Sequence, residues 1–169
     1  MLLTIKKTCK ITFMKSPEEL SAAFRSSGKK VTPQRFVVWK TLADNEAHPT
    51  AEAIFESVRG ELGTISLRTI YQILSELEEI GEIKCLDLGT GSARYDPNVL
   101  NIHHHLVCSI CNNVRDLHVN FENLEVPIDL LDGYEVGNAE VIFRGLCRSC
   151  REENMKLKVS GDRFSVSKE

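Results

Sequence analysis

Apolar residues recur at helical spacing through the first half of the chain, most clearly between Ser66 and Gly81. Six apolar positions in this stretch share one broad face of a helix, whereas polar positions project from the opposite face. The apolar set is Leu67, Ile70, Ile73, Leu74, Leu77 and Ile80, and the polar set is Arg68, Gln72, Ser75 and Glu79. This spacing, with a hydroxyl to cap the first turn and a glycine to end the last, predicts an amphipathic helix.

Three further helices are predicted ahead of this one. Each starts at a residue whose hydroxyl can cap the first turn, namely Ser16, Thr32 or Thr50. Proline follows the first two of these caps, where its fixed φ and missing N–H suit a helix start. Gly28 and Gly60 close the first and third helices. Helix, short turn and helix is the outline of a DNA-reading motif.

Beyond the helices, residues 83–88 and 93–95 predict a β-hairpin around the turn Gly89–Thr90–Gly91–Ser92. Helices followed by such a hairpin predict a winged helix. In a winged helix that reads DNA, the amino end of the Ser66 helix enters a major groove. The candidate DNA contacts are Lys29, Lys30, Arg35, Arg68, Thr69, Tyr71 and Gln72. A winged helix used only for protein contacts is the alternative interpretation.

The second half of the chain starts after a linker at Asp96–Pro97–Asn98, because proline restricts the residue before it. Strands are predicted at 106–107, 114–119, 134–136 and 139–146, with a short helix at 151–158. The fold class is therefore α+β, with a winged helix followed by a small α/β domain. The expected boundaries are a disordered extension at 1–13, the winged-helix domain at 14–95, a hinge at 96–101, a metal-binding domain at 102–158 and a tail at 159–169. Translation could start at Met1 or Met14.

The composition of the chain is compatible with this domain organisation. The chain has 169 residues with 42% apolar and 27% charged residues, which is ordinary for a globular protein. A net charge of −3 argues mildly against nucleic-acid binding, yet residues 1–40 hold nine Lys or Arg and only two acids. No stretch is long enough to span a membrane, and no signal peptide is visible. We therefore expect a cytoplasmic, reducing location.

Two Cys-x-x-Cys pairs are the strongest chemical signal in the chain. They are Cys108–Cys111 and Cys147–Cys150, and neither is expected to open a helix in the manner of a thioredoxin-like pair. Two such pairs converge readily on a tetrahedral structural zinc site. Disulfides or redox thiols are the alternative. Cys9 and Cys85 lie outside the pairs and are expected to be ordinary thiols.

A run of three histidines precedes the first pair. It indicates a second metal site, because the four cysteine sulfurs already occupy all four coordination positions of a zinc ion. On a strand, His103 and His105 face one side and His104 the other. Asp116 lies on the neighbouring predicted strand. Further candidates are His48, Asp96 and, as a sixth donor, His118, although each could instead be an ordinary surface or turn residue. Such a nitrogen and oxygen set suits Fe(II) or Mn(II), with zinc possible.

At these residues the chain resembles the ferric uptake regulator (Fur) family over about residues 14–152. The matching stretches are Val31–Thr32–Pro33–Gln34–Arg35, His48–Pro49–Thr50–Ala51, Ser66–Leu67–Arg68–Thr69–Ile70–Tyr71, Ala93–Arg94–Tyr95–Asp96, His103–His104–His105–Leu106–Val107–Cys108, Ala139–Glu140–Val141–Ile142 and Gly145–Leu146–Cys147, with the last pair. Several such stretches in the same order are highly specific.

The resemblance implies a homodimeric, metal-activated transcriptional repressor that is not an enzyme. Its winged helices bind palindromic operator DNA, the position of Tyr71 contacts the operator, and residues 102–158 form the dimerisation domain around a zinc ion held by the four cysteines. The regulatory ligands carry over to His48, Asp96, His103, His105 and Asp116. One ion held by these five would clamp the two domains in one orientation.

The resemblance is greatest to the peroxide-sensing PerR type, which has Asp at the positions of Asp96 and Asp116. The family's third metal site looks absent, because its positions read Ile102, His104 and Ala139. In the PerR type, peroxide and bound iron oxidise the imidazoles matching His48 and His103, and the operator is released. The alternatives are an iron- or zinc-uptake repressor of the same family, a thiol switch, or an enzyme, for which no nucleophile or acid–base pair is visible.

Two departures from the family bear on this chain alone. Many relatives have a helix after the strand of Asp116, but Pro127 and Gly133 interrupt that stretch, so a helix there must be short. Gln72 stands where arginine is frequent, so the operator sequence cannot be carried over from relatives.

Overall fold

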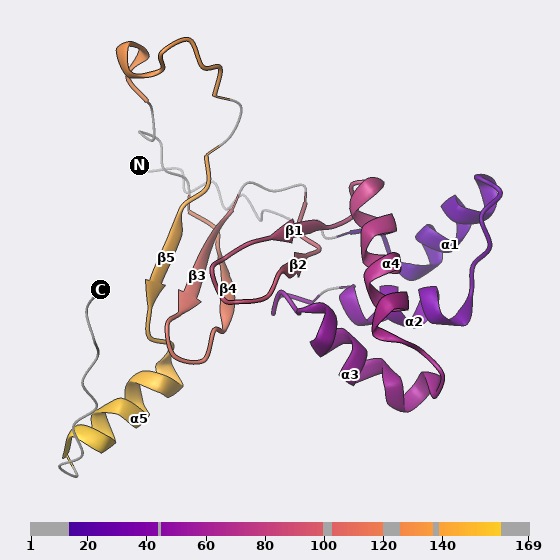
Figure 1. Ribbon diagram of the computed structural model, residues 1–169, viewed down its shortest axis with the longest axis horizontal. Helices are drawn as coiled ribbons and strands as arrows, with labels where there is room; N and C mark the ends of the chain where they lie inside the picture. The colour runs from indigo at the N-terminus through magenta and orange to yellow at the C-terminus, as the bar shows by residue number, and fades with distance from the viewer. Residues whose placement is uncertain (1–13, 44, 100–102, 120–125, 137–138, 160–169) are drawn as a thin grey trace, which may run out of the picture. The chain divides into compact units, whose positions relative to one another are not determined.

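The computed structural model describes residues 14–43, 45–99, 103–119, 126–136 and 139–159 (Figure 1). The chain divides into two compact units, Met1–Ile102 and His103–Glu169. The predicted extension at 1–13 and nearly all of the predicted tail lie outside the described residues.

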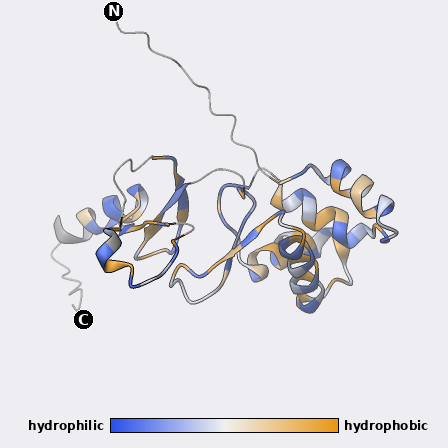
Figure 2. Cartoon of the chain, turned by 90° about the horizontal axis from the view of Figure 1, so that it is seen from above, coloured by the Kyte–Doolittle hydropathy of each residue, from blue (hydrophilic) through white to orange (hydrophobic). Residues whose placement is uncertain are grey.

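The described residues of the first unit form four helices, and each starts where the sequence predicts. They are α1 Pro17–Ser26, α2 Pro33–Leu42, α3 Ala51–Leu62 and α4 Leu67–Glu79. The third does not end at Gly60 as predicted, because it continues to Leu62 and Gly63 is its C-cap. Each helix is capped by the hydroxyl expected, and Ser16 forms a full capping box with Glu19. The helices show both apolar and polar stretches in Figure 2, as amphipathic elements do.

The core of the first unit is built on α4. Its inner face buries Ile70, Ile73, Leu74 and Leu77. Trp39 of α2 is fully buried and packs its ring 4.8 Å from that of Phe24 of α1. A continuous cluster of this kind stabilises the unit chiefly through the apolar area that it removes from water. The outer face of α4 is left exposed.

A two-stranded wing follows α4. Strands β1 Lys84–Leu86 and β2 Arg94–Asp96 are antiparallel, with Cys85 opposite Tyr95. Met14 also belongs to this unit, because its side chain is buried in the core and its N–H donates to the Pro97 carbonyl at 2.8 Å. Helices and a wing make the first unit a winged helix.

The described residues of the second unit form a three-stranded sheet in the order β4-β3-β5, followed by a helix. Strand β3 His104–Cys108 is central. It pairs antiparallel with β4 Val114–Leu117 and parallel with β5 Ile142–Gly145. Helix α5 Arg148–Val159 begins three residues after β5. The mixed helices and strands agree with the predicted α+β class.

Two details of the second unit differ from the sequence prediction. Residues 134–136 form no strand, because they follow a tight turn at Asp132 and Gly133, both with positive φ, and stay exposed. The terminal helix also starts earlier than expected, at Arg148. The only helical turn described between β4 and β5 is the short 3-10 helix η1 Ile128–Leu130, as Pro127 and Gly133 imply for the described part of that stretch.

Candidate metal centres and nucleic-acid interface

Four cysteine sulfurs meet at one end of the sheet of the second unit. All four Sγ atoms lie within 4.8 Å of one another, and those of Cys111 and Cys147 are 3.7 Å apart. In a tetrahedral site with Zn–S bonds of about 2.3 Å, the sulfurs lie roughly 3.8 Å from one another. All four of these thiols are free of disulfides. The cluster of Cys108, Cys111, Cys147 and Cys150 therefore has the spacing of a structural zinc site.

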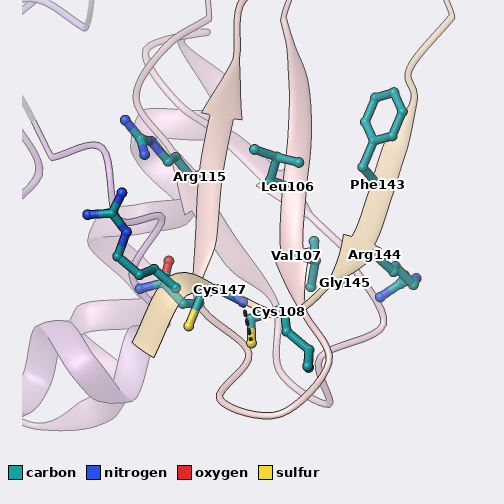
Figure 3. Close-up of a pocket in the computed structure, with 11 residues that line it drawn as sticks. Leu106, Val107, Cys108, Arg115, Phe143, Arg144, Gly145 and Cys147 are labelled. Atoms are coloured by element: carbon teal, nitrogen blue, oxygen red, sulfur yellow. Dashed lines mark hydrogen bonds between the residues drawn. The ribbon is translucent and has the colours of Figure 1, made fainter. Parts of the chain in front are cut away.

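The backbone of the sheet brings the two pairs together. The parallel register places Cys108, the last residue of β3, opposite Gly145, the last of β5. Ser109 N–H donates to the Gly145 carbonyl at 2.8 Å, and Cys147 N–H donates to the Cys108 sulfur at 3.4 Å, the dashed line in Figure 3. Asn112 takes a positive φ in the turn that follows Cys111. These contacts place the two pairs side by side at the end of the sheet.

The same contacts prepare one thiol for ionisation. Burial raises the pKa of Cys108, but N–H groups of Cys147, Cys111 and Ile110 outweigh it and lower this pKa to about 6. Hydrogen bonds to Cys147 and Cys111 raise the pKa of Cys150 to about 12. A cation at the centre would replace that proton, since zinc binds thiolates.

The expectation that neither pair opens a helix is wrong for the second pair. Cys147 directly precedes α5, and Cys150 lies in its first turn. The zinc assignment depends instead on the convergence of all four sulfurs, which a two-cysteine redox site does not need.

Imidazole and carboxylate groups form a second cluster in the same unit. The Nε2 atoms of His103 and His105 are 3.2 Å apart, and Asp116 Oδ1 is 3.7 Å from His103 Nε2. Asp116 sits opposite His105 in the β3–β4 register. All three side chains are more than nine-tenths buried. Strand alternation brings these three predicted ligands together as expected.

Two neighbouring histidines have different surroundings. His104 faces the other side of β3, where its Nδ1 accepts a hydrogen bond from Val141 N–H at 3.2 Å. His118 lies just beyond β4, with Nε2 3.8 Å from Asp116 Oδ2 and a side chain 41% exposed. His104 is therefore part of the sheet scaffold, and His118 borders the cluster from the solvent side.

The remaining two predicted ligands meet in the first unit. His48 Nε2 lies 3.5 Å from Asp96 Oδ1, and both side chains are 1% exposed. His48 has a φ of 48° and its Nδ1 lies 3.0 Å from the Glu46 carbonyl oxygen. Arg94 donates to the His48 carbonyl at 3.0 Å, which fixes this loop on β2. Neither residue is the exposed helix-start or turn residue that the simpler interpretation describes.

The donors fit a divalent transition metal. Each unit presents imidazole nitrogen beside carboxylate oxygen, in positions buried from water. Such donors suit Fe(II), Mn(II) or Zn(II), whereas two Cys-x-x-Cys pairs at tetrahedral spacing suit a structural zinc ion. The structure therefore supports two kinds of metal chemistry in one chain.

Sequence reasoning assigns no role to Glu140. Its Oε1 lies 2.7 Å from His105 Nδ1, on the ring edge opposite to Nε2. Its signal in the sequence is slight, an acid at the head of the apolar run that becomes β5. Only the pairing of β5 with β3 reveals the contact.

The outer face of α4 carries the candidate DNA contacts. Arg68 and Gln72 are exposed, as are Lys29 and Lys30 ahead of α2. Tyr71 is 44% exposed, and its hydroxyl donates to Glu52 Oε1 of α3 at 2.7 Å. This bond lowers the pKa of Glu52 and raises that of Tyr71. Thr69 lies in the first turn of α4, with its hydroxyl 2.9 Å from that of Ser66, the residue that caps the helix.

Arg35 is held inside the first unit. Its guanidinium makes two hydrogen bonds to the Glu76 carboxylate, at 3.0 and 2.7 Å, and another to the Lys30 carbonyl. It also lies 5.4 Å from the centre of the Phe24 ring. These contacts join α2 to α4, and the phosphate contact of Arg35 stays a prediction.

Residues 26–143 match the ferric uptake regulator family. The chain belongs to the ferric uptake regulator family. A peroxide-responsive repressor PerR of Staphylococcus epidermidis is 32% identical over 137 residues, covering 80% of this chain and 91% of that protein. A PerR of Staphylococcus aureus is 30% identical over 137 residues, covering 80% and 92%.

Solved structures agree with this Fur-family assignment. The ferric uptake regulator of Francisella tularensis with iron is 27% identical, with a TM-score of 0.63 over 73% of this chain and 96% of that one. A zinc-bound manganese uptake regulator is 25% identical, with a TM-score of 0.61 over 79% and 99%. The Helicobacter pylori Fur, at 21% identity and a TM-score of 0.67 over 83% and 97%, shows the shared fold.

Membership places the chain among metal-responsive transcription regulators. The four-cysteine cluster and the histidine–aspartate donors are the two kinds of metal site expected of such a protein. Among the described helices, none is both long and apolar enough to cross a bilayer.

Proposed function

We propose that this Fur-family protein is a peroxide-responsive, metal-dependent repressor that binds palindromic operator DNA as a homodimer in the cytoplasm. The observation that carries the proposal is the donor set, in which both carboxylates, Asp96 and Asp116, are aspartates beside buried imidazoles. The relatives that are PerR repressors support the peroxide branch. The exposed face of α4 supports the DNA partner.

In this proposal, His48, Asp96, His103, His105 and Asp116 bind one regulatory ion, Fe(II) or Mn(II). Ligands from both units would then hold the winged helix and the second unit in one orientation. A metal can favour that arrangement only by binding it more tightly than the alternatives. Shifting a mostly open population to a mostly closed one requires about 5 kcal/mol of differential binding.

Iron held by these residues would supply the redox chemistry that lets hydrogen peroxide oxidise a neighbouring imidazole, and it would end in its starting oxidation state. One peroxide oxygen is inserted at the C2–H of a ligand imidazole, His48 or His103, and the other leaves as water. The ring becomes a 2-oxo-imidazole, which is a poor metal ligand. Loss of one ligand weakens the binding of the metal ion that joins the two units, and the operator is released.

The test compares three tryptic peptides of the Fe(II)-loaded full chain after peroxide. Cleavage after Lys40, Arg59, Arg94, Arg115 and Arg144 yields peptides 41–59, 95–115 and 116–144. These contain His48, the 103–105 histidines and His118. Since His118 is the exposed one, oxidant in bulk solution would mark 116–144 first. Oxidant made at the ligands instead adds one oxygen to 41–59 or 95–115, which is the expected result.

Manganese-loaded protein is the matched control and is expected to keep both its histidines and its operator through peroxide treatment. Equal sensitivity of the manganese form, with disulfides in place of histidine oxidation, would establish a thiol switch. Iron-dependent operator binding that survives peroxide with unmodified peptides would favour the alternative, an iron-uptake repressor. Binding that requires zinc would favour the zinc-uptake type.

A further inference from the structure

We propose that Glu140 is a positioning residue of the regulatory metal site, which orients His105 and sets the nitrogen with which it binds the metal. This rests on the metal-binding part of the proposed function and on neither DNA binding nor peroxide chemistry. The central contact joins Glu140 Oε1 to His105 Nδ1 at 2.7 Å. The His105 side chain is 3% exposed and that of Glu140 is 39% exposed.

The backbone around Glu140 is fixed to the strand that carries His105. The next residue, Val141, accepts a hydrogen bond from His105 N–H at 3.2 Å. Its own N–H donates to His104 Nδ1, also at 3.2 Å. Ile142 then pairs with His105 in the parallel register. Glu140 is therefore delivered to His105 by the sheet, and it does not depend on a loose loop contact.

The contact decides which nitrogen of His105 carries the proton. A carboxylate accepts hydrogen bonds, so Nδ1 must hold a hydrogen to donate. Nε2 then keeps its lone pair for a metal. This is the nitrogen that points to the cluster, 3.2 Å from His103 Nε2. A carboxylate behind a metal-binding imidazole also makes the ring a stronger donor.

Glu140 is placed behind the ligand and is not a ligand itself. Its carboxylate occupies the Nδ1 edge of the ring, whereas the other donors gather at the Nε2 edge. His103, His105 and Asp116 have donor atoms within 4.8 Å of one another, and Glu140 is not one of that group. The proposal therefore adds a residue that acts through His105.

The experiment measures Mn(II) binding to the zinc-replete full chain by competition with a fluorescent chelator. Loss of the partner of a ligand histidine typically weakens metal binding by roughly 10- to 100-fold, so we expect that loss for Glu140→Ala. Glu140→Gln, which keeps the shape but not the charge, is expected to bind Mn(II) more weakly than wild type and more tightly than Glu140→Ala. Glu135→Ala removes an exposed acid of the same segment and is the control, with unchanged binding expected.

A second readout separates positioning from a merely structural role. Long-range ¹H–¹⁵N spectra of the wild-type chain with zinc in the regulatory site report the tautomer of His105 directly. We expect a proton on Nδ1 and metal on Nε2, with the Nδ1 proton signal lost or shifted upfield in Glu140→Gln. Coordination through Nδ1 in the wild-type chain would overturn the proposal without any variant.

Equal Mn(II) affinity of wild type and Glu140→Gln would also overturn it. That comparison stands even if Glu140→Ala fails to keep its four-cysteine zinc. Failure of the wild-type chain to bind Mn(II) would instead remove the proposed function. The two failures are therefore distinguishable.

Discussion

Arg35 is bound on several sides at once. Its guanidinium meets both oxygens of Glu76, and the two side chains are only 18% and 20% exposed. A paired arrangement of this kind is geometrically specific and is costly to break from one side, because the other charge is left poorly solvated. The residue therefore contributes to the packing of α2 on α4.

Replacing Glu76 with Ala is expected to lower the free energy of unfolding by about 2 kcal/mol, since it leaves the Arg35 charge without its partner. Urea denaturation followed by circular dichroism measures this change. Lys40→Ala, at an exposed position of α2, is the control and should change stability by less than about 0.5 kcal/mol. Unchanged stability with weakened operator binding would instead assign the pair to the DNA contact.

The partner of Arg35 could not be found from the sequence. Glu76 is 41 residues away and falls on the polar side of its helix, where an acid normally needs no partner. The contact of Glu140 could not be predicted for the same reason, because Glu140 is 35 residues from His105. By contrast, His103, His105 and Asp116 could be grouped in advance, because strand alternation and a short connection are local rules.

At the scale of elements, α4 has one face buried in the core and one face exposed to solvent. Ile70, Ile73, Leu74 and Leu77 are buried, while Arg68, Tyr71 and Gln72 are exposed. Periodicity predicted this helix well because one face has a single large core to cover. It failed for residues 134–136, where three residues after a turn have no buried face to define a strand.

Leu74→Ala is expected to lower the free energy of unfolding by about 3 kcal/mol, because its side chain is fully buried and the core can close only part of the cavity. Thermal and urea denaturation of the full chain measure the loss. Ser75→Ala, the next residue on the exposed face, is the matched control and should be nearly neutral. A small effect at Leu74 would contradict the packing of α4 described here.

At the scale of the whole molecule, the two units differ in what holds them together. The first has a large apolar core that includes Trp39, Leu42 and Ile54. The described buried apolar residues of the second are few, namely Val107, Cys108, Val114 and Cys150. We expect a unit with so small a core to need its metal for stability, as other small metal-binding domains do.

Removal of zinc by a strong chelator, or Cys111→Ser, is therefore expected to unfold the second unit while the winged helix stays folded. Hydrogen exchange should show rapid exchange of the β3, β4 and β5 amides and continued protection of α4. Cys85→Ser, outside the cluster, is the control and should leave both units protected. Protection of β3 in the zinc-free chain would contradict this dependence.

Strand β3 carries His105 near one end and Cys108 at the other, three residues and about 10 Å apart. The two centres thus share one short strand. If that strand loses its order at the cysteine end, the position of the His105 side chain changes as well. In a cell starved of zinc, copies of this metal-responsive regulator would therefore lose the order of their histidine cluster and could not bind its metal, whatever the supply of that metal.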